Sequence, residues 1–152
     1  MTFTVKNVDW GKDKHKLRKL RNKIFVCHWR IPQEYEFDQQ DKDAYHALVV
    51  DENNQDVATG RITEQGEIGR IAVEPQHRGP EVYQLLFNAL ICIAQQHGLH
   101  SVNVLCELEG VEHYQQQGFQ PVGPVFMDAG IARQSMACSV ANFSLNKVEF
   151  TH

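Results

Sequence analysis

The first chemistry suggested by this sequence lies in a short stretch near its centre. Arg78-Gly79 follows an apolar run, Ile71–Val73, and precedes an amphipathic helix expected over Glu81–Gln96. A loop that leads into a helix offers unpaired N–H groups and the positive end of the helix dipole, and both favour an anion. The stretch therefore predicts a binding site for a phosphate or pyrophosphate group.

Three residues of the same stretch count against a phosphate site. Pro80 has no N–H, Glu81 is an anion, and Tyr83 is bulky where phosphate loops usually carry glycine. Proline suits the first turn of a helix, and a carboxylate near a pyrophosphate costs roughly 1 kcal/mol per close pair in water. A Tyr83 side chain that points outward is harmless, whereas one that points inward blocks the site. We therefore expect anion binding that is weakened.

The elements that position this loop follow from hydrophobic periodicity. The pattern predicts helices over 14–26, 81–96 and 109–117, a polar loop over 28–45, and strands over 2–8, 46–51, 57–63, 67–73, 101–106, 119–125 and about 135–140. This order predicts a single α/β (α+β) domain over 1–152, with a mixed central sheet flanked by helices. The strands 67–73 and 101–106 are expected side by side and parallel, splayed at their C-terminal ends, because the helix between them must cross over.

Composition narrows the class of protein. The chain has 152 residues, a formal net charge of −4 and 42% apolar residues, as in ordinary globular domains. It has no apolar run of membrane-spanning length and no secretory leader, so a cytoplasmic location is expected. The four cysteines form no C-x-x-C pair, which favours free, mostly buried thiols over a zinc site.

The first 30 residues carry a net charge of +7 and the rest −11. The basic residues lie on a predicted helix whose apolar side is Leu17, Leu20 and Ile24, so we interpret them as its exposed face. A nucleic-acid patch is the less favoured alternative.

The order of elements, with Arg78-Gly79 at the start of the central helix and Tyr114-Gln115-Gln116-Gln117-Gly118-Phe119 downstream, resembles the GNAT N-acetyltransferase superfamily. Other segments resemble its ElaA/YjcF-like branch. They are Arg21–Val26, Pro32, Asp38, His46, Gly60–Ile62, Ile68–Val73, Gly130-Ile131 and Met136. The resemblance covers nearly the whole chain.

The resemblance implies acetyl-CoA as co-substrate. The backbone of one strand would pair with the pantetheine arm, and the following loop and helix N-terminus would hold the pyrophosphate. The positions that match are Ile71, Ala72, Val73, Arg78, Gly79, Glu81, Val82 and Tyr83. The family pattern, Arg/Gln-x-x-Gly-x-Gly/Ala, places glycines at positions 81 and 83, so this loop is degenerate by comparison.

The resemblance also implies catalytic positions. Tyr114 matches a tyrosine that often acts as general acid to the leaving thiolate, with a packing role as the equal alternative. Glu107 and Glu67 are candidate bases, although each could serve only as a helix-start or outward strand residue. His28-Trp29 and Arg133 depart from the branch pattern on the side that faces the acceptor. No metal is implied.

The favoured function is an N-acyltransferase that moves an acetyl group from acetyl-CoA to an amine of a small molecule or peptide by direct attack. The alternative is a GNAT-fold protein that has lost catalysis and acts as a binding or regulatory module. A homodimer is expected because four aromatic residues fall in or beside a polar segment, where they would line a pocket or a subunit contact. They are Trp29, Tyr35, Phe37 and Tyr45.

Overall fold

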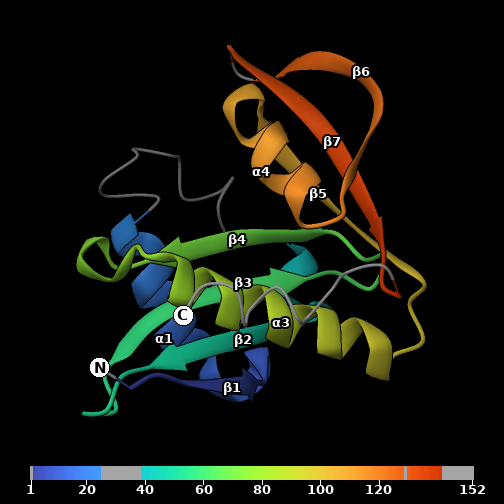
Figure 1. Cartoon of the computed structure of the whole chain (residues 1–152). Helices are drawn as coiled ribbons and strands as arrows, with labels where there is room; N and C mark the ends of the chain where they lie inside the picture. The colour runs from blue at the N-terminus through green and yellow to red at the C-terminus, as the bar shows by residue number, and fades with distance from the viewer. Residues whose placement is uncertain (1, 25–38, 129, 142–152) are drawn as a thin grey trace.

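The computed structural model of the chain describes residues 2–24, 39–128 and 130–141. Figure 1 shows two sheets with helices packed against them. The helices are α1 (Trp10–Arg21), α3 (Pro80–Gln96) and α4 (Val111–Gln116), with 3-10 turns η2 (Gln39–Lys42), η3 (Pro75–His77) and η4 (Leu108–Gly110). The strands are β1 (Thr4–Val8), β2 (Tyr45–Val50), β3 (Asp56–Ile62), β4 (Ile68–Val73), β5 (Ser101–Glu107), β6 (Gln120–Asp128) and β7 (Ile131–Ser139).

The larger sheet has the order β1-β2-β3-β4, and each neighbouring pair is antiparallel. Its middle strand β2 is buried on both faces. Ala47 and Val49 belong to the core cluster that includes α3, whereas Leu48 and Val50 pack with α1. Because successive strand residues point to opposite faces, α1 and α3 cover opposite sides of this sheet.

Helix α1 begins four residues earlier than the sequence pattern predicts. The side chain of Asp9 accepts a hydrogen bond from the N–H of Gly11 and caps the helix N-terminus. The basic residues were expected to lie on the exposed face, and Lys12, Lys14, Lys16, Arg18, Lys19 and Lys23 do so. Arg21 departs from that expectation, since its side chain is buried.

The smaller sheet has the order β5-β7-β6, and both pairs are antiparallel. Its edge strand β6 is exposed along its whole length and contains Pro121 and Pro124. Gly123 has a φ of 73°, and the register of β6 against β7 shifts between Val122 and Phe126. The hairpin is therefore irregular near the middle of β6.

The expected pairing of β4 with β5 is confirmed only at their N-terminal ends. Glu67 and Asn103 form a parallel bridge, and the N–H of Asn103 donates to the carbonyl of Gly66 at 2.9 Å. Beyond this bridge the two strands belong to separate sheets, so the expectation of one continuous sheet is wrong. The cause is a bulge in β4, where Arg70 has a φ of 51° and the register against β3 shifts.

Candidate functional site

The edge of β4 that faces β5 is the first part of the site. On its other side β4 pairs with β3, through Ala58 opposite Val73 and Thr59 opposite Ala72. The bridge to β5 ends at Glu67, so Ile71–Val73 have no strand partner on this edge within the described part of the chain. Such an edge can pair with an extended ligand as if the ligand were another strand.

The N-terminus of α3 lies directly beyond this edge. Pro80 occupies the first helical position, and Gly79 is the N-cap residue without a side chain to fill the cap. The N–H groups of Glu81 and Val82 have no acceptor within the helix, so the first turn still offers two donors despite the proline. A Cβ at Gly79 would meet no described atom within 4 Å. The approach to these donors is therefore uncovered.

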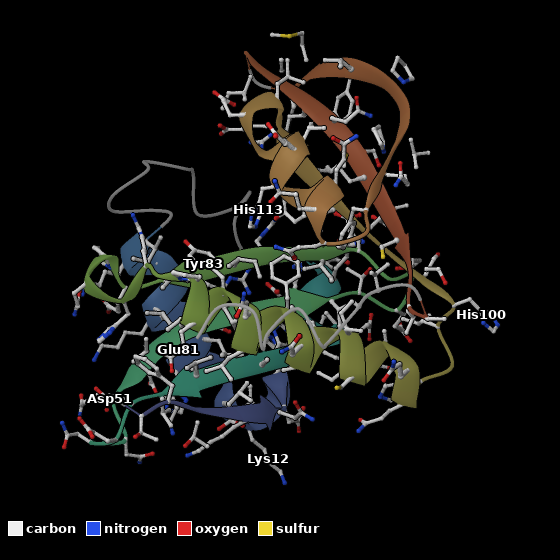
Figure 2. All side chains as sticks on the ribbon, viewed as in Figure 1. Lys12, Asp51, Glu81, Tyr83, His100 and His113 are labelled. Atoms are coloured by element: carbon white, nitrogen blue, oxygen red, sulfur yellow. The ribbon has the colours of Figure 1, made fainter. Side chains whose placement is uncertain are left out.

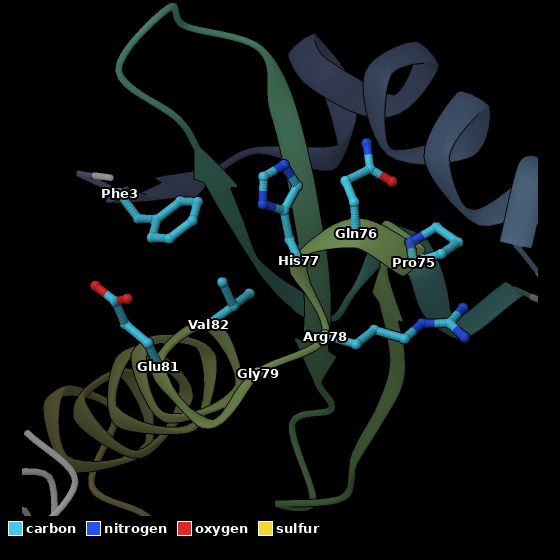
Figure 3. A pocket seen from close by; sticks show the side chains of 8 residues that line it. All are labelled: Phe3, Pro75, Gln76, His77, Arg78, Gly79, Glu81 and Val82. Carbon is cyan, nitrogen blue, oxygen red and sulfur yellow. The ribbon is translucent and has the colours of Figure 1, made fainter.

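Arg78 connects the end of β4 to the loop that leads into α3. Its Nε donates to the carbonyl oxygen of Val73 at 3.1 Å, which holds the loop against the end of β4. In Figure 3 its guanidinium points away from the side where Phe3 and Glu81 lie. The residue predicted to bind phosphate thus has a structural contact of its own.

A cleft of about 350 Å³ opens beside the loop (Figure 3). Phe3 and His77 meet there edge to face, with ring centroids 5.5 Å apart. The complete lining is Phe3, Pro75, Gln76, His77, Arg78, Gly79, Glu81 and Val82. Nothing in the pattern of the sequence pointed to Phe3, which directly precedes β1, the edge strand farthest from β4, and contacts His77 of the loop.

Tyr83 is not among the residues that line this cleft. In Figure 2 it lies on the side of α3 nearer to α4 and His113, whereas Glu81 lies on the side nearer to β1. Tyr83 packs against the core cluster and lies close enough to Tyr114 to affect its ionisation. Whether Tyr83 obstructs a pyrophosphate on the side of α3 toward α4 stays a prediction for the binding experiment below.

Tyr114 has the packing contacts that were one of its two expected roles. Its ring packs against Phe87 and Phe119, with centroids 5.9 Å and 5.4 Å away. Burial, followed by the neighbouring Cys106 and Tyr83, raises the pKa of Tyr114 to about 12. The phenol therefore keeps its proton at neutral pH.

The two candidate bases are separated from each other. Glu107 is exposed at the C-terminal end of β5, directly opposite Arg133 of β7. Glu67 is exposed at the start of β4, roughly 20 Å from Val73 by the rise of a strand. The structure thus places Glu107 and Tyr114 at the same end of β5, and Glu67 at the opposite end of β4 from the loop.

A buried group of charged residues fixes the segment before β2, and sequence reasoning missed it. Asp41 Oδ1 lies 2.8 Å from Nη1 of both Arg21 and Arg61, and all three side chains are buried. His46 Nε2 lies 2.9 Å from the carbonyl oxygen of Asp41 and therefore donates to it. Burial, as the largest cause, lowers the pKa of His46. Trp10 stacks on this histidine, with ring centroids 5.1 Å apart.

The described residues were also searched for metal-ligand groups, reactive thiols and membrane-spanning helices. Among residues 2–24, 39–128 and 130–141, no group of three or more metal-ligating side chains gathers. Cys92, Cys106 and Cys138 are free thiols, as expected, and the last two are buried. No helix in these same ranges is long and apolar enough to cross a membrane.

Of the four aromatic residues expected at a pocket or interface, only Tyr45 lies within the described residues. It is half-buried and stacks on His97, with ring centroids 4.0 Å apart. Trp29, Tyr35 and Phe37 lie outside the described residues. The expected homodimer therefore stays a prediction, which light scattering over a range of concentrations tests.

Comparison with known proteins identifies the family and the fold. The family model described as an acetyltransferase (GNAT) domain matches residues 23–140. The solved structure of Escherichia coli ElaA is similar, with a TM-score of 0.78, 24% identity, and coverage of 91% of this chain and 100% of the other. An acyl-CoA N-acyltransferase from Pseudomonas aeruginosa has a TM-score of 0.76, 22% identity, and coverage of 91% and 99%.

Proposed function

Because this chain belongs to the GNAT acetyltransferase family, we propose that it transfers an acetyl group from acetyl-CoA to an amine of a small molecule or peptide. The observation that carries the proposal is the edge of Ile71–Val73, which lacks a strand partner in the described residues and leads to the N-terminus of α3. An extended pantetheine arm can pair with the free edge of Ile71–Val73, and a pyrophosphate can bind at the N-terminus of α3.

Each part of the donor meets a different group of this chain. The backbone of Ile71, Ala72 and Val73 pairs with the arm, and the amides of Glu81 and Val82 hold the pyrophosphate. Gly79 leaves room for that approach, while Arg78 fixes the loop through Val73. Tyr83 packs against the core near Tyr114. When bound, acetyl-CoA supplies the thioester that the amine attacks.

In the reaction the amine nitrogen forms a bond to the acetyl carbon and the carbon–sulfur bond breaks. The sulfur takes the proton of Tyr114, which is protonated at neutral pH. The amine gives up a proton to solvent or to a base, for which Glu107 is better placed than Glu67, because Glu107 lies at the same end of β5 as Tyr114. Positioning supplies much of the rate in such a direct transfer.

A second function is favoured by Glu81, whose exposed carboxylate lines the cleft beside the loop. Together with Pro80, which contributes no N–H, it weakens the pyrophosphate site. A protein that binds a CoA-like ligand without turnover is therefore the alternative: a binding or regulatory module.

Two measurements on the purified chain distinguish the transferase from the binding module. The first is calorimetry with acetyl-CoA, and the second is an acetylation assay with mixed amines. Binding with turnover supports the transferase, binding without turnover supports the module, and no binding refutes both. Glu81→Gly combined with Tyr83→Gly probes the loop. The loss of the anion should tighten acetyl-CoA binding about fivefold, from roughly 1 kcal/mol of repulsion. Glu52→Gly, at the exposed turn between β2 and β3, is a control for general effects of losing a carboxylate.

A further inference from the structure

The exposed side of α1 carries a stripe of like charges. Lys12, Lys16 and Lys19, here called the lysine stripe, are exposed and lie three or four positions apart, so they share one face of the helix. In Figure 2 Lys12 points away from the sheet. None of the three takes part in an ion pair of residues 2–24, 39–128 and 130–141. The one acid of α1, Asp13, instead accepts a hydrogen bond from the backbone at the start of the helix.

Such a stripe differs from an ordinary wet helix face. Like charges three or four positions apart repel one another, and exposed helices usually offset this with carboxylates at the same spacing. The lysine stripe has no such carboxylates within the part of the chain that the structure describes. An anionic partner that bound along α1 would therefore both find complementary charge and relieve this repulsion.

The lysine stripe leads to the loop of the proposed donor site. Lys23, four positions after Lys19, donates to the two carboxylate oxygens of Glu74 at 3.0 Å and 2.8 Å. Glu74 directly follows Val73, the last residue of β4, and precedes η3. Figure 1 shows the C-terminal end of α1 beside this loop. A partner on the lysine stripe therefore lies next to the end of the free edge of β4.

The chemistry of α1 favours an acidic protein surface as that partner. The ring of Trp10 contacts His46 and Arg21, so it is already engaged and does not stack on a nucleobase. Leu17 and Leu20 are buried beneath the helix, so the exposed side has no apolar side chain to enter a bilayer. Lysine carries a point charge on a flexible stem, which suits carboxylates spread over a folded surface.

The proposed donor exists in two forms that share the pantetheine arm. Coenzyme A joins the arm to a pyrophosphate and a nucleotide, whereas a carrier protein joins it to a serine through a single phosphate. The start of α3 suits the single phosphate better, because Pro80 contributes no N–H and the exposed carboxylate of Glu81 repels phosphate charge. The free edge of Ile71–Val73 suits both forms, since it pairs with the arm alone.

We propose that an acidic carrier protein, with an acetyl group on its serine-linked phosphopantetheine, binds the lysine stripe and delivers its arm to the edge of β4. The inference rests on the proposed acetyl transfer and adds a second form of the donor. The covalent step is the same as with acetyl-CoA. The amine nitrogen loses a proton and bonds to the acetyl carbon, the carbon–sulfur bond breaks, and the thiol of the carrier's arm leaves with a proton.

Calorimetry of the full chain with a purified acidic acyl carrier protein, at about 50 mM salt, tests the inference. The probes are the acetylated carrier, the same carrier without its phosphopantetheine, and acetyl-CoA. Lys12→Gln, Lys16→Gln and Lys19→Gln combined should weaken binding of the acetylated carrier about tenfold, because each exposed ion pair is worth roughly a factor of two to five. Salt at about 300 mM should bring the wild type close to this variant.

A matched control makes the same change in net charge elsewhere. Gln95→Glu, Gln96→Glu and Gln120→Glu combined alter exposed residues of α3 and β6, away from α1. This control should keep the carrier affinity within about twofold, and both variants should change the acetyl-CoA affinity by the same factor. Equal carrier affinities of the lysine variant and the control would overturn the inference. So would equal wild-type affinities for the carrier with and without its arm.

Failure of the inference and failure of the proposed function give different results. If acetyl-CoA binds and is turned over but the carrier does not bind, the carrier alone is refuted. If the carrier binds through the lysine stripe and acetyl-CoA does not bind, coenzyme A is refuted as the donor and the carrier stands. A DNA duplex that binds more tightly than the carrier, with the same dependence on the lysines, would assign the stripe to nucleic acid and refute the inference.

Discussion

Gly60 on β3 offers a quantitative test of how β4 is held in place. It lies opposite the bulge in β4, between the paired residues Thr59 and Arg61. A Cβ at this position would lie 2.8 Å from Cδ1 of Ile71 and 3.2 Å from Cδ1 of Leu90. Carbon atoms pack best at about 3.5–4.0 Å, so Gly60→Ala forces the end of Ile71 to move by roughly 0.7 Å or more. Both contacted atoms are ends of flexible side chains and Ile71 is half-buried, so the cost lies at the low end of overpacking, about 1 kcal/mol.

Gly69→Ala is the matched control, because a Cβ there meets no described atom within 4 Å. Neither glycine has a positive φ. Both variants gain the same small stability from a less flexible unfolded chain, so their difference isolates the overpacking. We expect urea unfolding with unchanged m-values to show Gly60→Ala about 1 kcal/mol less stable than Gly69→Ala. Because Ile71 belongs to the proposed donor strand, Gly60→Ala should also weaken acetyl-CoA binding. Equal stabilities of the two variants would refute the close packing of β3, β4 and α3.

Three further predictions concern buried polar groups. Tyr114→Phe should lower turnover at least tenfold and remove the tyrosine whose pKa is about 12 from an alkaline absorbance titration; full activity would leave Tyr114 with packing alone. The pKa of His46 is lowered in the folded state, so its contribution to stability is present above pH 6.5 and is lost as the pH falls through the folded value. His46→Gln should flatten the acid side of the stability curve, and an unchanged slope would contradict this. Asp41→Asn should lower the free energy of unfolding by about 3–5 kcal/mol, because it removes the carboxylate shared by two buried guanidinium groups, whereas the exposed Asp43→Asn should change it by less than about 0.5 kcal/mol.

Hydrophobic periodicity correctly predicted the helices and strands in which the apolar residues of the pattern are also the buried residues. The predicted strand 46–51 has apolar residues on both faces and forms β2 (Tyr45–Val50), one of the two inner strands of the larger sheet. The stripe that ends before Gly98 forms α3, and Leu17, Leu20 and Ile24 are buried beneath α1 as expected. In each case the pattern and the packing follow from the same residues.

The parts that periodicity missed depend on residues far apart in the chain. Asp41 looks like a loop residue until Arg21 and Arg61, each 20 positions away, are brought to it. The separation of β4 from β5 depends on the left-handed backbone of Arg70, which no local pattern indicates, since non-glycine residues seldom adopt it. The same bulge bends the strand whose edge we propose as the donor site, so the site was harder to predict than the helices around it.

The two prolines of β6 affect how molecules of this protein behave at high concentration. A long exposed strand at the edge of a sheet, rich in Val, Phe and Met, would ordinarily invite the same strand of another molecule to continue the ladder. Pro121 and Pro124 remove two N–H donors from β6, and the irregular register around Gly123 interrupts the straight edge. This strand can therefore keep apolar side chains exposed without serving as a template for fibril growth. Replacing both prolines should bring that hazard back.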